Sequence, residues 1–154
     1  MSLQVGDKAP DFTMPADGGG TVSLAALKGR PVVLYFYPRD DTPGCTTEAC
    51  GFRDAMPDFS GIDAAIVGVS RDTVAKHDKF KAKYALPFTL GADDSGSVTE
   101  AYGVWVEKSM YGIKRMGIER ATFLIGRDGV IRGIWRKVKV AGHVDEVLAA
   151  AKGL

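Results

Sequence analysis

The chain is organised around Pro31-Val32-Val33-Leu34-Tyr35-Phe36-Tyr37 and the segment that follows, Pro38-Arg39-Asp40-Asp41-Thr42-Pro43-Gly44-Cys45-Thr46-Thr47-Glu48-Ala49-Cys50. The first seven residues form an unbroken apolar and β-branched run, which predicts a strand buried on both faces. Pro38 ends this strand because it has no N–H for the ladder. A turn is expected at Pro43-Gly44, and a helical pattern begins at about Cys45. The two cysteines of the chain therefore lie in one strand–turn–helix unit.

Cys45 is predicted to lie in the first turn of this helix, a position that suits a thiolate. Free N–H groups and the positive end of the helix dipole stabilise an anion there. Thr42, three residues upstream, can cap the helix or turn its hydroxyl toward the sulfur. A lone cysteine is more often a small buried hydrophobic residue. The position at the helix start and the presence of a second cysteine favour a chemical role instead.

Cys50 lies five residues further on, and this spacing has a geometric consequence. An intact helix holds the two Cα atoms about 8 to 9 Å apart and about 140° around the axis. A disulfide requires Cα atoms no more than about 7 Å apart. The two cysteines are therefore unrelated, or the helix unwinds when they bond. Ala49, Phe52 and Met56 share a face with Cys45, which predicts that Cys45 points inward and Cys50 does not.

Composition excludes several classes of protein. A chain of 154 residues has the length of one domain. Its 45% hydrophobic and 25% charged residues are typical of a soluble globular protein. The net charge of +1 gives no global attraction to nucleic acid or to an anionic membrane. No secretory signal is recognised and the cysteines number two, so we expect a reducing compartment, by default the cytoplasm, with a removed transit peptide as the alternative.

The rest of the chain is interpreted from hydrophobic periodicity and turn residues. Helices that alternate with buried strands, followed by a hairpin and a helix, predict an α/β sandwich with a central mixed β-sheet. Residues 103–117 carry aromatic and methionine side chains among charges, and we expect a loop near the active site. The other predicted elements are an N-terminal hairpin (12–14 with 21–24), a helical turn (24–27), a buried strand (64–70), a helix (73–84, with Asp72 as N-cap), a short strand (86–90), a short helix ending at Tyr102, a hairpin (120–125 with 130–135) and an amphipathic C-terminal helix (Val144, Val147, Leu148, Ala151).

The spacing Pro38-x3-Thr42-x2-Cys45 resembles the active-site motif of the peroxiredoxins, and the longer string to Cys50 is similar to their Q-type, or bacterioferritin-comigratory, branch. The resemblance covers nearly the whole chain. It implies a single peroxiredoxin domain over residues 1–154, with a thioredoxin-like sandwich flanked by helices and an N-terminal hairpin. It also implies that Cys45 is the peroxidatic cysteine, that Cys50 is the resolving cysteine, and that Pro38 and Thr42 shape the pocket.

A peroxidase site needs a cationic donor beside the thiolate, because negative charge develops on oxygen during the reaction. An arginine suits this role, since it stays charged and offers a planar fork of donors. The resemblance assigns it to Arg120, with Arg39 in the motif as the competitor. Ala121 stands where relatives commonly have serine, and Gly126 replaces an acidic residue. We expect these two differences to tune the activity and not to abolish it.

The resemblance also implies the substrates and partners. Hydrogen peroxide and alkyl hydroperoxides are the expected substrates, and thioredoxin or a similar dithiol reductant is the expected partner, acting on a Cys45–Cys50 disulfide within one chain. No cofactor, metal, nucleic acid or membrane is expected. We expect a monomer, with a dimer as the alternative.

Four other functions are weighed against the peroxidase. A redox-sensing or chaperone-like binding protein would use the same cysteines as a switch, and would oxidise once where an enzyme cycles. A thiol–disulfide oxidoreductase of the thioredoxin type would use Cys-x2-Cys, whereas this chain has Cys-x4-Cys. A metal site would need more ligands than the two cysteines with His77 and His143, which we expect on helices far from them. No histidine is adjacent to either cysteine, so a Cys–His protease has no local support.

Overall fold

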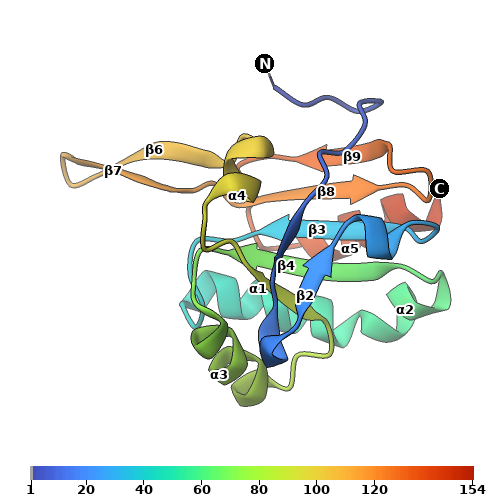
Figure 1. Ribbon diagram of the computed structural model, residues 1–154, viewed down its shortest axis with the longest axis horizontal. Coiled ribbons are helices and arrows are strands. Elements are labelled where there is room, and N and C mark those ends of the chain that lie inside the picture. Colours follow the sequence, from blue (N-terminus) through green and yellow to red (C-terminus); the bar gives the residue numbers. More distant parts are fainter. Residues whose placement is uncertain (1) are drawn as a thin grey trace.

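The computed structural model describes residues 2–154. Its centre is a five-stranded mixed sheet (Figure 1). The central strand β3 pairs in parallel with β4, and β4 pairs in parallel with β5. On the other side, β8 is antiparallel to β3, and β9 is antiparallel to β8. The strand order is β5 (Thr89–Ala92), β4 (Ala65–Ser70), β3 (Val32–Phe36), β8 (Ala121–Ile125) and β9 (Ile131–Trp135). The prediction of a central mixed β-sheet is therefore confirmed.

Strand β3 is buried along its whole length, as its apolar sequence predicts. Because side chains alternate along a strand, Val32, Leu34 and Phe36 enter one hydrophobic cluster, and Val33 and Tyr35 enter the other. The second cluster receives side chains from four helices. These helices are α1 (Pro43–Asp54), α2 (Met56–Gly61), α3 (Val74–Tyr84) and α5 (His143–Lys152).

The first cluster is covered by the N-terminal part of the chain and by a short helix. The hairpin expected there is present, with Thr13 paired to Ser23 in antiparallel register. The predicted helical turn after it is a short 3-10 helix. The elements of this layer are β1 (Thr13–Pro15), η1 (Asp17–Gly19), β2 (Thr21–Ser23), η2 (Ala25–Leu27) and α4 (Ser97–Ala101).

The prediction of a loop over residues 103–117 is wrong, because this segment forms two strands. β6 (Trp105–Met110) and β7 (Ile113–Ile118) pair as an antiparallel hairpin that projects from the sheet (Figure 1). Tyr111 and Gly112 form its two-residue turn, and both have positive φ, 53° and 76°. Most of the hairpin is exposed. A hairpin that is mostly exposed needs no apolar alternation, so its sequence lacks the usual strand signal.

Two helix boundaries also differ from the prediction. Thr73 and not Asp72 caps α3, because the Thr73 hydroxyl accepts from the Lys76 N–H at 3.2 Å. The Asp72 carboxylate instead accepts hydrogen bonds from the Ser70 hydroxyl and from the backbone N–H of Asp40, which lies before α1. Helix α1 begins at Pro43, two residues before the expected start at about Cys45, and ends at Asp54. Among residues 2–154, no helix combines the length and the apolar character needed to cross a bilayer.

Candidate active site

The sheet topology brings two distant segments to one edge. Strand β3 leads through residues 37–42, called here the motif loop, into helix α1. Strand β8 runs antiparallel to β3, and its first residue Ala121 lies opposite Phe36, the last residue of β3. Arg120, directly before β8, therefore lies at the edge of the sheet where α1 begins.

Cys45 is buried in the first turn of α1, as the helix pattern predicts. The Nη2 atom of Arg120 donates to the Cys45 sulfur at 3.3 Å. A guanidinium and the N-terminal end of a helix both stabilise negative charge at this position. Arg39, the competing arginine, is exposed. The geometry thus favours Arg120 as the partner of the sulfur.

Gly44 permits this close approach. A Cβ atom at this position would lie 3.1 Å from the Arg120 Nη2 atom, so the guanidinium would have to move by a few tenths of an ångström. Gly44→Ala is therefore expected to slow Cys45 oxidation by about tenfold through misplacement of the guanidinium. The melting temperature should not fall, because alanine favours a helix more than glycine does.

Stopped-flow oxidation kinetics and thermal melts check this expectation. Gly61→Ala serves as the matched control, because a Cβ at Gly61 meets no atom within 4 Å. A Gly44→Ala protein that reacts with peroxide at the wild-type rate would show that the contact between Arg120 and Cys45 tolerates displacement.

Glu48 is a member of the site that the sequence analysis did not identify. Its Oε1 atom accepts from Arg120 Nη1 at 2.7 Å, so one guanidinium bridges Glu48 and Cys45. Its Oε2 atom is buried and has no hydrogen-bond partner among the described residues. Burial raises the pKa of Glu48 to about 7, although the charge and hydrogen bond of Arg120 oppose this shift. The sequence signal for Glu48 was its position three residues after Cys45, because this spacing puts both side chains on one face of a helix.

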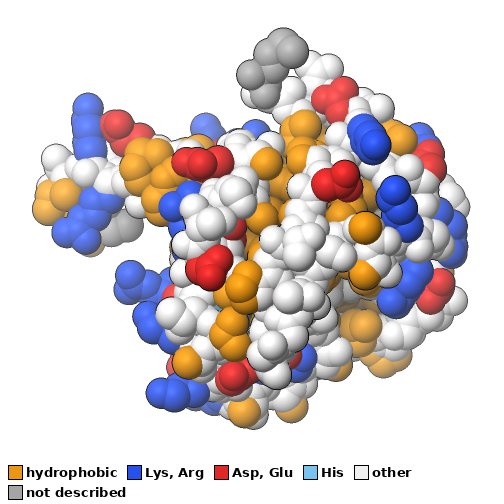
Figure 2. All heavy atoms as spheres, in the orientation of Figure 1, with side chains coloured by type: hydrophobic (Ala, Val, Ile, Leu, Met, Phe, Trp, Pro, Cys, Tyr) orange, Lys and Arg blue, Asp and Glu red, His pale blue; other side chains and the backbone are white. Residues whose placement is uncertain are grey.

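Thr42 occupies the N-cap position of α1, but its side chain does not cap the helix. Its hydroxyl donates to the carbonyl of Arg39 at 2.9 Å, a local turn that competes with capping. Thr42 and Pro38 line a cleft of about 570 Å³ whose other wall includes Trp105 and Met116 of the β6–β7 hairpin. Figure 2 shows the hairpin standing away from the body, with basic side chains on both sides of the hollow beneath it. The hairpin therefore lies beside Pro38 and Thr42 of the candidate site.

Cys50 is half-buried and lies on the same helix as Cys45. Both cysteines are free thiols, and α1 is continuous from Pro43 to Asp54. A disulfide between them is therefore incompatible with this conformation, because an intact helix holds their Cα atoms farther apart than a disulfide allows.

The two histidines have surroundings that the sequence did not predict. We expected His77 far from the cysteine segment, but its ring bonds to Asp40 in the motif loop, because α3 packs beside that loop. His143 Nε2 lies 2.8 Å from the Thr122 hydroxyl. Burial, helped by the charge of Arg120, lowers the pKa of His143 to about 4, so this imidazole is neutral near pH 7. Within residues 2–154, no cluster of three or more metal-ligating side chains is found.

Fold and site together define a class of protein. A cysteine in the first turn of a helix that follows a buried central strand, contacted by an arginine directly before the neighbouring strand, is typical of a thiol-based redox enzyme. The five-stranded mixed sheet with its flanking helices gives that enzyme a thioredoxin-like fold.

Comparison with known proteins agrees with this class. The model of the AhpC/TSA family matches residues 5–134. Peroxiredoxin Bcp of Bacillus subtilis is 51% identical over 154 residues, covering 100% of this chain and 98% of that protein. Peroxiredoxin Bcp of Escherichia coli K12 is 42% identical over 146 residues, covering 95% and 94%.

Solved structures of other proteins resemble this chain over most of its length. The bacterioferritin comigratory protein of Xanthomonas campestris, studied for alkyl peroxide reduction, superposes with a TM-score of 0.88 at 46% identity, covering 92% of this chain and 90% of that one. A mutant of PrxQ from Xylella fastidiosa gives a TM-score of 0.94 at 39% identity, covering 99% and 98%. The chain belongs to the AhpC/TSA family and is a peroxiredoxin, a thiol-dependent peroxidase.

Proposed function

We propose that Cys45 is the peroxidatic nucleophile of this enzyme, that Arg120, Thr42 and Pro38 form its pocket, and that Cys50 is the resolving cysteine. The observation that carries this proposal is the 3.3 Å hydrogen bond from Arg120 Nη2 to the sulfur of Cys45 at the start of α1. The substrates are hydrogen peroxide and alkyl hydroperoxides, and thioredoxin or a similar dithiol protein supplies the electrons.

In the first half of the cycle, the Cys45 thiolate attacks the terminal peroxide oxygen. The S–O bond forms as the O–O bond breaks, which leaves sulfenic acid on sulfur and releases water or an alcohol after protonation of the leaving oxygen. Donors fixed before the reaction stabilise the charge that develops on oxygen. Arg120 and the N–H groups of the first turn of α1 supply such donors. We propose that the peroxide approaches through the cleft that Pro38 and Thr42 line.

In the second half of the cycle, the Cys50 thiolate attacks the sulfenic sulfur of Cys45. A disulfide forms, and water leaves with the sulfenic oxygen. Because an intact helix holds these residues too far apart, α1 must unwind around them. The opened segment then exposes the disulfide to a dithiol, whose two thiols become oxidised as Cys45 and Cys50 are reduced.

The proposed enzyme acts as a monomer in a reducing compartment. Cys45, Cys50, Thr42 and Arg120 all come from one chain, so a monomer has a complete site. A cycle that needs Cys50 as a thiol suits a reducing compartment such as the cytoplasm. Residues 1–154 act as one peroxiredoxin domain.

Mass spectrometry of peroxide-treated protein tests the second half of the cycle. We expect a Cys45–Cys50 bond within one chain, together with lost amide-exchange protection over residues 43–50. Cys50→Ser should consume one equivalent of peroxide and then stall until a small thiol is added. An intermolecular bond, or unchanged protection of α1 after oxidation, would refute the scheme. Continuous turnover with thioredoxin separates the enzyme from a redox sensor, which would oxidise once.

A further inference from the structure

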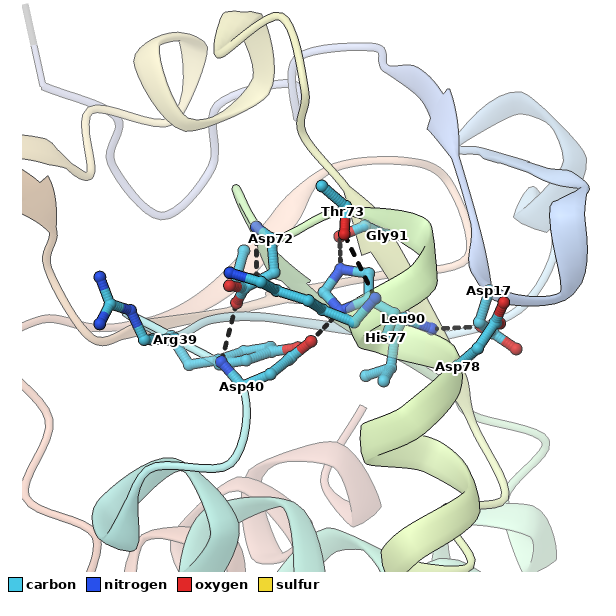
Figure 3. Close-up of polar contacts among 12 residues, drawn as sticks. Asp17, Arg39, Asp40, Asp72, Thr73, His77, Asp78, Leu90 and Gly91 are labelled. Carbon is cyan, nitrogen blue, oxygen red and sulfur yellow. Dashed lines mark hydrogen bonds and ion pairs between the residues drawn. The ribbon is translucent and has the colours of Figure 1, made fainter.

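A buried polar cluster lies beneath the motif loop, on the side of α3 (Figure 3). The Oδ2 atom of Asp40 lies 2.6 Å from His77 Nδ1, and its Oδ1 atom accepts from the Tyr37 hydroxyl at 2.5 Å. On the far side of the ring, His77 Nε2 lies 2.9 Å from the carbonyl oxygen of Gly91 in β5. The cluster thus ties the motif loop to helix α3 and to an edge strand of the sheet.

The bonding partners determine where the protons lie. A carbonyl oxygen only accepts, so His77 Nε2 carries a hydrogen and donates to Gly91. When Nδ1 also carries a hydrogen, it donates to the Asp40 carboxylate, and every polar atom of the ring has a partner. A neutral ring with its hydrogen on Nε2 would instead turn a lone pair toward that carboxylate. The imidazolium–carboxylate pair is therefore the form that best fits this geometry.

Charged neighbours support the same assignment. Burial lowers the pKa of His77, but the hydrogen bond and charge of Asp40 raise it, with smaller contributions from the Gly91 carbonyl and from Asp72, so the net shift is upward. Asp72 also accepts the backbone N–H of Asp40 at 2.7 Å. From the N-terminal side of the fold, Asp17 faces α3 but is paired with Lys81.

The position of Asp40 gives this pair a functional setting. Asp40 lies between Pro38 and Thr42, which are proposed to shape the pocket, and three residues before the first residue of α1. Its side chain and its backbone N–H are both held by groups outside the loop. The loop is therefore fixed directly upstream of the segment that must unwind for a Cys45–Cys50 bond.

We propose that Asp40 and His77 are positioning residues that form a latch: they hold the motif loop and the first turn of α1 in the conformation that reduces peroxide, and their release accompanies unwinding of α1. This inference rests on the proposed roles of Cys45 and Cys50. Neither Asp40 nor His77 touches the reacting atoms, so both act through the loop.

The latch makes the local stability of the loop depend on pH. The folded pKa of His77 lies above its ordinary value of 6.5. The stabilisation is therefore fully present below about pH 6.5 and is lost as the pH rises through the raised folded value. At higher pH the loop should open more readily, which favours disulfide formation over retention of the reduced, folded helix.

Three variants separate this latch from a merely structural pair. Asp40→Ala removes it. Asp40→Asn keeps it without charge, because the amide can donate to a neutral His77 while its oxygen accepts from Tyr37. Asp41→Asn is the matched control. Asp41 accepts hydrogen bonds from Lys83 and Tyr84 of α3, the helix that also carries His77, but Asp41 is exposed to solvent. Asparagine also tolerates the positive φ of 56° at this position.

Two measurements on the chain of 154 residues test the latch. Hydrogen exchange of the reduced protein compares the amides of residues 42–50 with those of β4, and rapid-quench mass spectrometry follows Cys45 oxidation and disulfide formation separately. For Asp40→Ala we expect amide exchange over 42–50 to accelerate about tenfold relative to β4, with faster disulfide formation and slower Cys45 oxidation. Asp40→Asn should restore protection and abolish its pH dependence, and Asp41→Asn should match the wild type.

Equal acceleration of exchange in β4 and in residues 42–50, with both chemical steps within twofold of wild type, would overturn the latch. If Asp40→Ala fails to fold, the pH profile of Asp40→Asn decides, and a profile identical to that of the wild type overturns the proposal. Exchange of the reduced protein and oxidation of Cys45 need no Cys50. A missing Cys45–Cys50 bond therefore refutes the proposed resolving step without obscuring the result for the latch.

Discussion

Replacement of Cys45 by serine is expected to abolish thioredoxin-dependent peroxide reduction, with a loss of at least about 10³-fold. The thiolate is the nucleophile, and a serine hydroxyl is not appreciably ionised near neutral pH. The hydroxyl is smaller than the thiol, so the substitution fits the buried position and should leave the fold intact. Peroxide consumption in a coupled assay measures the effect.

Cys50→Ser is the matched control for this substitution, because it changes the same atom type on the same helix. It should retain the first oxidation of Cys45 and lose only the resolving step, whereas Cys45→Ser should lose both. Residual turnover of Cys45→Ser within tenfold of the wild type would exclude Cys45 as the nucleophile. A wild-type circular dichroism spectrum for both variants would show that the loss is chemical.

The elements that hold the site were predictable because their sequences carry strong local signals. Strand β3 is a continuous apolar run, and it is buried on both faces in the structure. The C-terminal helix was predicted from the spacing of Val144, Val147, Leu148 and Ala151, of which the last three are buried. Cys45 points inward because it shares a helix face with Ala49 and Phe52, both buried. Periodicity suffices where one face of an element must leave water.

The features that sequence reasoning missed depend on contacts between distant residues. Glu48 becomes part of the site only when Arg120 meets it, 72 positions along the chain. His77 bonds Asp40 from 37 positions away, and no local pattern marks either residue as a partner of the other. The β6–β7 hairpin was missed for another reason: it is held by its own ladder and turn, and it buries too little surface to show alternation.

Arg120→Ala is the second substitution for which a large effect is expected. It removes a cationic donor from the Cys45 sulfur, and loss of one such group commonly costs about 10² to 10³ in rate. We therefore expect Cys45 oxidation to slow by about that factor. Stopped-flow kinetics with excess peroxide measure this effect.

Glu48 makes it possible to separate the chemical effect of Arg120 from a structural one. Without Arg120 the buried Glu48 carboxylate loses its counter-charge, which would destabilise the fold if Glu48 remained ionised. The pKa of Glu48 is already raised to about 7 by burial, so loss of the opposing arginine should lead Glu48 to bind a proton. The double variant Arg120→Ala with Glu48→Gln should therefore recover stability but not activity. Arg39→Ala, at the exposed arginine of the motif loop, provides the control, and an effect confined to Arg39→Ala would transfer the role to that residue.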